Sequence, residues 1–336
     1  MKIPPRLKKL LRWLPPVLIL ALVLSLLGAL FLPLRSDQIA IRIKAGDNAA
    51  TIGQRLKESG IIRSARLFRF MASLRGTDRR LIAGTYSLGG NHSLYATLRL
   101  LEKGNVSAVK ITFPEGLSLY KTLQRIERSG LASYDELEKL ATDSLFVEKL
   151  TGFRAPSLEG WLYPETYFFP PDVNPEEILS QMTEQFFSRM RAARIDPFHT
   201  DNFYQVLIQA SIVEKESSFA DERPLVASVI RNRLEAGMRL ESCPTVDYVL
   251  ERQGVKKTVL SLQDTQIQSP YNTYRNFGLP PGPICNPSVS SLKAVLEPAQ
   301  TDYFFFVADR KGRNDFSATA AEHMRKAAAY KRAEWE

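Results

Sequence analysis

Two glutamates close the most apolar helical segment of the chain, in a position that suits acid–base chemistry. Residues 202–217 read NFYQVLIQASIVEKES, and apolar side chains fall on every face of the predicted helix, which is typical of a buried helix. Glu214 and Glu216 come at its end. At about 100° per residue their side chains point about 200° apart, so they cannot share one task on one face.

Glu216 extends the apolar stripe that runs through Ile208 and Ile212. A carboxyl group held against apolar surface has a raised pKa, and an acid that is still protonated near pH 7 can donate a proton to a leaving group. A hydrolytic glycosidase normally needs a second carboxylate, whereas attack by the sugar's own hydroxyl needs only one. An alternative also remains open: both glutamates are solvated or paired with nearby arginines. The candidates for that pairing are Arg223, Arg231 and Arg233.

The elements before this helix predict an α+β chain in two parts. Alternating residues 39–44 predict a strand, and Asn48 is a suitable cap for a helix to about residue 58. A second helix over 65–74, a strand over 83–88 and a helix over 93–102 complete a small unit, 38–106. The larger unit, 107–333, carries the glutamates. Within it, residues 158–169 are rich in aromatics, which suits either a carbohydrate cleft or a core.

The N-terminal 35 residues predict a membrane anchor. Residues 13–34 are uncharged and would reach roughly 33 Å as a helix, enough to cross the hydrocarbon core. Residues 1–12 carry five basic and no acidic side chains, which places that end in the cytoplasm. We therefore expect a single-pass inner-membrane protein with a cytoplasmic tail (1–12), a transmembrane helix (13–35) and an extracytoplasmic body. A cleavable signal peptide is the alternative.

The net charge excludes one class of partner. The chain carries +9 in total, and the N-terminal tail accounts for five of these charges. The remaining excess of about +4 is too small for a nucleic-acid-binding surface. It suits a polyanionic cell wall or simple solubility.

An ordered set of motifs resembles the endolytic murein transglycosylases, the MltG or YceG-like family. The central motif is Ala210 to Glu216, with its E-K-E ending. The other matching segments are 83–86, 113–116, 159–161, 164–166, 226–234, 237–240, 244–246, 269–274, 278–284 and 286–287. The match spans about residues 38–330, and the preserved order makes it specific.

The resemblance implies a fold, a reaction and site residues. The fold would be a LysM-like glycan-binding unit followed by a mixed α/β catalytic domain. The reaction would be internal cleavage of MurNAc–GlcNAc bonds that leaves 1,6-anhydro-MurNAc ends, with Glu216 as the catalytic acid and no cofactor or metal. Expected partners are peptidoglycan strands and penicillin-binding proteins of the machinery that builds the wall and sets cell shape. The expected substrate-binding residues are Glu165, Glu214, Thr245, Tyr271, Asn272, Thr273 and Tyr274.

Three departures from the family pattern stand out. Family members usually have Asp in place of Cys243 and a small residue in place of Cys285. Many have a His shortly before the phenylalanine that corresponds to Phe316, where this chain has Asn314 and Asp315, so a role for that His cannot be transferred. Because both cysteines fall in motifs expected near the cleft, we predict a Cys243–Cys285 disulfide, worth roughly 4 kcal/mol for such a loop. Two independent thiols are the alternative.

Two other functions remain open at this point. One is a non-catalytic scaffold that binds peptidoglycan through the LysM-like unit. The other is a muramidase with two carboxylates, in which Glu165 or Glu222 would assist Glu216.

Overall fold

The computed structural model describes residues 16–332 except 19, 22–23, 26, 35, 45, 79–80, 91, 105–107, 258 and 310. The predicted cytoplasmic tail lies outside these residues, as do several positions of the predicted transmembrane helix. Among the residues described, no helix has the length and apolar character needed to cross a membrane. The chain divides into two compact units, one made of residues 1–109 and 168–172 and the other of 110–167 and 173–336.

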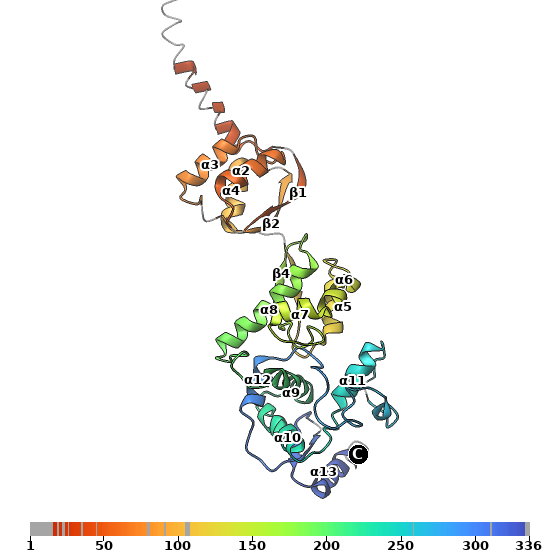
Figure 1. Ribbon diagram of the computed structural model, residues 1–336. Helices are drawn as coiled ribbons and strands as arrows, with labels where there is room; N and C mark the ends of the chain where they lie inside the picture. Colours follow the sequence, from red (N-terminus) through yellow and green to blue (C-terminus); the bar gives the residue numbers. More distant parts are fainter. Residues whose placement is uncertain are drawn as a thin grey trace, which may run out of the picture. The chain divides into compact units, whose positions relative to one another are not determined.

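The first unit is a small antiparallel sheet with three helices. Strands β1 (Ser36–Ile43) and β2 (Gly84–Gly90) pair, and the helices are α2 (Ala49–Glu58), α3 (Ala65–Leu74) and α4 (Leu94–Lys103). The predicted order of strand, helix, helix, strand and helix is confirmed (Figure 1).

Local sequence explains the elements of this first unit. The Asn48 side chain accepts hydrogen bonds from the backbone N–H groups of Ala50 and Thr51, so it caps α2 as predicted. Strand alternation directs Ile41 and Ile43 to one face of the sheet, where both are buried against the helices. Ile39, nearer the start of the strand and next to a register shift, is partly exposed.

The second unit begins with a helical subassembly. Strands β3 (Val109–Thr112) and β4 (Thr166–Phe169) form a two-stranded sheet, and the division between the units passes through these strands. The helices of this part are α5 (Leu119–Arg128), α6 (Tyr134–Ala141), α7 (Ser144–Thr151) and α8 (Pro175–Ala192).

The aromatic segment 158–169 belongs mainly to the core. Trp161 and Phe169 are fully buried, and Trp161 contacts the rings of Phe153, Phe186 and Phe203. The core interpretation is therefore the correct one for these side chains, because ring contacts and burial together account for them.

Helix α9 (Phe203–Glu216) lies at the centre of the remaining part. It packs against α10 (Arg223–Glu235) and α12 (Val289–Leu296) (Figure 1). Ile212 and Val213 share a hydrophobic core with apolar residues of both helices. This explains why α9 is apolar on every face.

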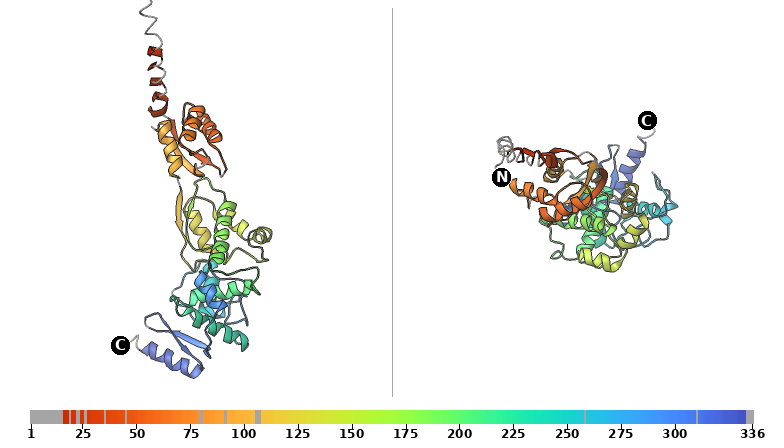
Figure 2. Two further views of the ribbon diagram at one scale, coloured as in Figure 1. Left: turned by 90° about the vertical axis from the view of Figure 1, so that its left-hand side faces the viewer. Right: turned by 90° about the horizontal axis from the view of Figure 1, so that it is seen from above.

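The last elements of the chain complete the second unit. They are α11 (Cys243–Arg252), the short 3₁₀ helix η1 (Asp264–Gln266), strands β5 (Phe305–Ala308) and β6 (Asn314–Ser317), and α13 (Ala320–Arg332). Strands β5 and β6 form an antiparallel hairpin, and α13 packs on it (Figure 2).

Candidate active site

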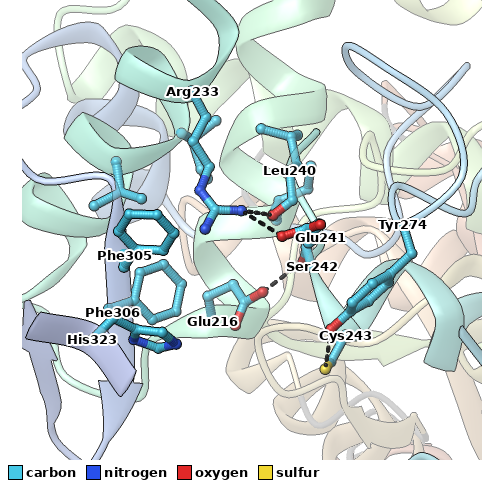
Figure 3. A pocket seen from close by; sticks show the side chains of 13 residues that line it. Glu216, Arg233, Leu240, Glu241, Ser242, Cys243, Tyr274, Phe305, Phe306 and His323 are labelled. Atoms are coloured by element: carbon cyan, nitrogen blue, oxygen red, sulfur yellow. Dashed lines mark hydrogen bonds and ion pairs between the residues drawn. The ribbon is translucent and has the colours of Figure 1, made fainter. Parts of the chain in front are cut away.

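A cavity of about 330 Å³ opens at the C-terminal end of α9, where Glu216 is the last helical residue. Its volume falls in the range of small-ligand sites. Figure 3 shows how the walls come from α9, α10, the segment before α11, the loop around Tyr274, β5 and α13. The lining residues are Ile212, Glu216, Val229, Ile230, Arg233, Leu240, Glu241, Ser242, Cys243, Tyr274, Phe305, Phe306 and His323.

Among the described residues, the Glu216 carboxyl group has a single side-chain donor. The Ser242 hydroxyl donates to its Oε1 at 2.6 Å. Burial raises the pKa of Glu216 to about 7, although the Ser242 hydrogen bond and the positive charge of Arg233 lower it in part. The negative end of the α9 dipole also disfavours an anion at this position. Glu216 is therefore protonated in a large share of molecules at neutral pH, as a general acid requires.

Arg233 and Glu241 form a polar wall of the cavity. The Arg233 guanidinium donates to the carbonyls of Leu240, at 2.9 Å, and Phe304, at 2.6 Å, and it lies over the Phe305 ring. Glu241 approaches Arg233 at 3.5 Å. The φ angle of Glu241 is +48°, a left-handed conformation that costs a non-glycine residue energy. This turn directs the following residue, Ser242, toward Glu216 (Figure 3).

The predicted loop 271–274 supports the site mostly from behind. Thr273 Oγ1 accepts a hydrogen bond from the Ser242 backbone N–H at 3.0 Å, and Thr273 and Thr245 join their hydroxyls at 2.9 Å. Asn272 is fully buried and donates to two backbone carbonyls of its own loop. These three predicted substrate-binding residues therefore position Ser242 or their loop and do not line the cavity.

The two tyrosines of this loop have different places. The Tyr271 ring packs against Tyr248, with centroids 4.9 Å apart. Tyr274 lines the cavity, and its hydroxyl lies 3.0 Å from Cys243 Sγ. Of the predicted substrate-binding set, Tyr274 is thus the member that the structure brings to Glu216.

Glu214 has no place in the cavity, in contrast to its predicted role. Its carboxylate pairs with Arg223 at 2.8 Å and accepts from the Ser288 backbone N–H, the Ser288 hydroxyl and the Ser291 hydroxyl. Because four donors already surround it and its side chain is only 4% exposed, it ties α9 to α10 and α12. The arginine alternative was therefore correct for this glutamate.

Glu165 is likewise engaged elsewhere. Its carboxylate pairs with Arg189 and accepts from the Gln185 amide of α8. These contacts fix the start of β4 on α8, so the structure does not place Glu165 beside Glu216. Glu222, the other predicted muramidase partner, is buried in an ion pair with Arg313 at 3.0 Å.

The structure does not contain the predicted disulfide. Both cysteines are free thiols. Cys243 opens α11 at the cavity and contacts Tyr274, whereas Cys285 is fully buried and donates to the Ser211 backbone carbonyl at 3.3 Å. The thiols therefore have different surroundings and different partners. Burial raises the pKa of each of them.

Several site residues were not found from the sequence. His323 of α13 stacks on Phe305 with its Nδ1 atom buried and without a hydrogen-bond partner among the described residues. Burial lowers the pKa of His323, which keeps the ring neutral. Asn314, which stands in the region of the missing family His, donates to the Glu216 backbone carbonyl at 3.1 Å. The signal that could have found Ser242 is its place two residues before the matching motif that begins at Pro244. Across the described part of the chain, no three metal-ligating side chains cluster.

Comparisons with known proteins agree with this geometry. The model of the YceG-like family matches residues 41–329. The chain belongs to the YceG-like family. This confirms the resemblance drawn from the ordered motifs.

Individual relatives extend the match. A Bacillus subtilis protein named endolytic murein transglycosylase is 32% identical over 302 residues, which covers 85% of this chain and 82% of the relative. A Streptococcus pneumoniae protein of the same name is 27% identical over 329 residues, 87% of this chain but 58% of the relative. The crystal structure of a YceG-like protein from Listeria monocytogenes aligns with a TM-score of 0.59 at 32% identity, covering 86% of this chain and 99% of that one.

Proposed function

We propose that this family member is an endolytic lytic transglycosylase, a lyase that cuts MurNAc–GlcNAc bonds within peptidoglycan strands and leaves 1,6-anhydro-MurNAc ends. The observation that carries the proposal is Glu216: a carboxyl group with a pKa near 7 and one donor, set in the wall of a cavity. The names of the Bacillus and Streptococcus relatives support the same activity.

The reaction needs one group that serves first as acid and then as base. Protonated Glu216 gives its proton to the glycosidic oxygen as the bond to the anomeric carbon breaks. The resulting carboxylate then takes the proton of the C6 hydroxyl while O6 bonds to the anomeric carbon. Glu216 thus regains its proton, and no water is consumed. The Ser242 hydroxyl donates to the carboxylate between the two steps, which stabilises the charged form.

The aromatic wall suits a sugar ring. Tyr274, Phe305 and Phe306 line the cavity, and aromatic faces pack well against the C–H surfaces of sugars. Arg233 and neutral His323 on the same wall supply donors for sugar hydroxyl or acetamide oxygens.

A second candidate function is a muramidase in which water attacks. The observation that favours it is Glu241, a second carboxylate that lines the same cavity. It would have to activate a water across the sugar ring from Glu216. Glu241 is paired with Arg233 at 3.5 Å, and this pair would have to open before the carboxylate could hold a water.

The test is digestion of isolated glycan strands by wild type and the Glu216→Gln variant, read by mass spectrometry. We expect wild-type products that lack one water relative to hydrolysis products, and a loss of rate of about 10²-fold or more in the variant. Reducing ends in place of anhydro ends would establish the muramidase. Full activity of the variant would refute Glu216 as the acid. No cleavage by wild type would favour a binding scaffold.

We also propose where the enzyme works. The apolar segment 13–35 would anchor it in the inner membrane with the N-terminus in the cytoplasm, and the unit 38–106 would act as a LysM-like glycan-binding or spacer domain. Penicillin-binding proteins are the proposed partners. Exposure of the body to protease added outside spheroplasts, with the N-terminus protected, would support this orientation. The reverse pattern would refute it.

A further inference from the structure

A second cavity, of about 410 Å³, adjoins the last turn of α9 at Lys215. Its walls include Tyr120, Lys121 and Gln124 of α5, Lys215 of α9, and Asp247 and Glu251 of α11. Lys256 and Lys257, just beyond α11, complete its charged rim. None of these residues takes part in the proton transfers assigned above.

This charged cavity begins one helical turn from the candidate active site. Cys243 lines the first cavity and Asp247 the second, and residues four apart on a helix lie on one face, about 6 Å apart along the axis. On α9, Lys215 of the second cavity directly precedes Glu216 of the first. A ligand in the second cavity is therefore within reach of a substituent on a sugar bound at Glu216.

The charges of the second cavity are only partly neutralised within the protein. Lys121 pairs with Glu251, and Lys257 pairs with Asp264 at 2.6 Å. Within the described part of the chain, Lys215 and Lys256 have no carboxylate at ion-pair distance; Lys215 reaches only the Gly116 carbonyl, at 3.5 Å.

Asp247 is the acidic counterpart of these free lysines. It has no cationic partner at ion-pair distance among the described residues. Within the described part of the chain, the cavity thus offers two ammonium groups and one carboxylate that form no ion pair at contact distance. A ligand of matching chemistry is a short peptide that carries at least two carboxylates and one free amine.

We propose that this cavity binds the stem peptide that branches from the MurNAc residue whose bond is cut. The inference rests on the proposed function, because the peptide is attached to the lactyl group of the reacting sugar and must leave the site close to Glu216. Lys215 and Lys256 bind its carboxylates, and Asp247 binds the side-chain amine of its diamino acid. The enzyme then prefers strands that still carry peptides.

The first experiment compares two substrates. Uncrosslinked strands with peptides and strands stripped by an amidase, which keep the lactyl carboxylate, are digested by the full chain. We expect wild type to have a higher kcat/KM on peptide-bearing strands, and Lys256→Glu to lower the ratio of the two kcat/KM values about five- to tenfold, as expected for reversing one exposed charge partner. Lys139→Glu, an exposed lysine of α6 outside both cavities, is the matched control and should keep the wild-type ratio.

The second experiment does not depend on cleavage. A fluorescent stem peptide is titrated into full-length Glu216→Gln protein, and the affinity should fall about five- to tenfold with Lys256→Glu added. Acetylation of the peptide's side-chain amine should weaken its binding to protein that keeps Asp247. It should not change binding to the Asp247→Asn variant. These losses should shrink at high salt, because exposed charges are screened.

The outcomes separate the two proposals. Two results would overturn the peptide site. One is a wild-type kcat/KM that is equal on both substrates, and the other is an equal fall of kcat/KM on both substrates in Lys256→Glu. The lysines would then bind the lactyl carboxylate or no part of the substrate. Peptide binding that depends on Lys256, together with no cleavage of any strand, keeps the peptide site and overturns the proposed function. Absence of peptide binding overturns the peptide site alone.

Discussion

Two glutamates stand two residues apart at the end of α9, and their surroundings differ sharply. Glu214 accepts hydrogen bonds from Arg223, from Ser288 twice and from Ser291. Glu216 accepts one from the residues that the structure describes, donated by Ser242, and its side chain lines a cavity. The same helix thus carries a carboxylate saturated by donors and a carboxyl group left with a proton to give.

The difference shows what distinguishes a carboxylate that stabilises the fold from a carboxyl group that can transfer a proton. Several fixed donors stabilise the anion and leave no lone pair for a substrate. A single donor in an apolar setting leaves the acid protonated near neutral pH and leaves one oxygen free. Glu214 should therefore matter for folding and Glu216 for the reaction.

The largest expected effect that tests this comparison is on stability. Glu214→Gln keeps the shape of the side chain but removes the charge that pairs with Arg223, whose side chain is only 8% exposed. Glu115, at 3.7 Å from Arg223, is a weaker substitute. We expect the free energy of unfolding to fall by about 3 kcal/mol, measured by urea denaturation.

Glu216→Gln is the matched control for that measurement. It removes a carboxyl group that is already costly to ionise, so its stability should change by less than about 1 kcal/mol. If the two variants unfold at the same urea concentration, the division between a structural and a chemical glutamate is wrong.

The sequence predicted α9 and the separation of its two glutamates, because helix geometry is local. It could not tell which glutamate faces a cavity, since a helix that is apolar on every side has no distinctive face. The deciding donors, Ser288 and Ser291, come from α12, more than 70 residues later. Their approach depends on tertiary packing, which periodicity does not encode.

The motif at 269–274 shows a similar limit. The resemblance pointed to a loop whose Tyr274 lines the cavity, but Thr273 and Asn272 are buried and act through Ser242 and the loop backbone. The disulfide was likewise predicted because both cysteines fall in motifs expected near the cleft, although motif positions contain no distance between the thiols. Phe305 and Phe306 of the aromatic wall come from β5, and His323 comes from α13. Nothing in the local pattern of those segments points to α9.

A third glutamate sharpens the comparison, because it is buried and lines neither of the two cavities described above. Glu159 is 2% exposed and accepts a hydrogen bond from the Leu119 backbone N–H at 2.8 Å. Burial raises its pKa to about 8. Its folded pKa lies above the unfolded value, so the folded state binds the extra proton and loses stability as pH rises from about 5 to about 8.

Glu159→Gln should remove this pH dependence. Relative to wild type, the variant should gain about 2 kcal/mol of stability between pH 6.5 and pH 8.5, measured by urea denaturation at both values. Other titrating groups cancel in the difference between the two proteins. A difference that does not change with pH would mean that the carboxyl group is ionised in the folded state throughout this range.

The smallest expected effect concerns the Ser242 hydroxyl, which donates a hydrogen bond to the Glu216 carboxyl group. Ser242 stabilises the ionised form of Glu216 and so lowers its pKa. In Ser242→Ala the pKa should rise by about one unit, since a hydrogen bond to a charged group contributes roughly 1.5 kcal/mol. Because the acid must be protonated to act, activity should persist about one pH unit further into the alkaline range.

The pH profile of kcat/KM on glycan strands measures this shift, and Ser242→Thr, which keeps the hydroxyl, is the control. The alkaline limb should lie near pH 7 in wild type and Ser242→Thr and near pH 8 in Ser242→Ala. A lower rate with an unmoved limb would show that Ser242 shapes the cavity without tuning the acid. A limb that moves to lower pH would mean that the titrating group on that side is not Glu216, because losing a donor to a carboxylate can only make its proton harder to remove.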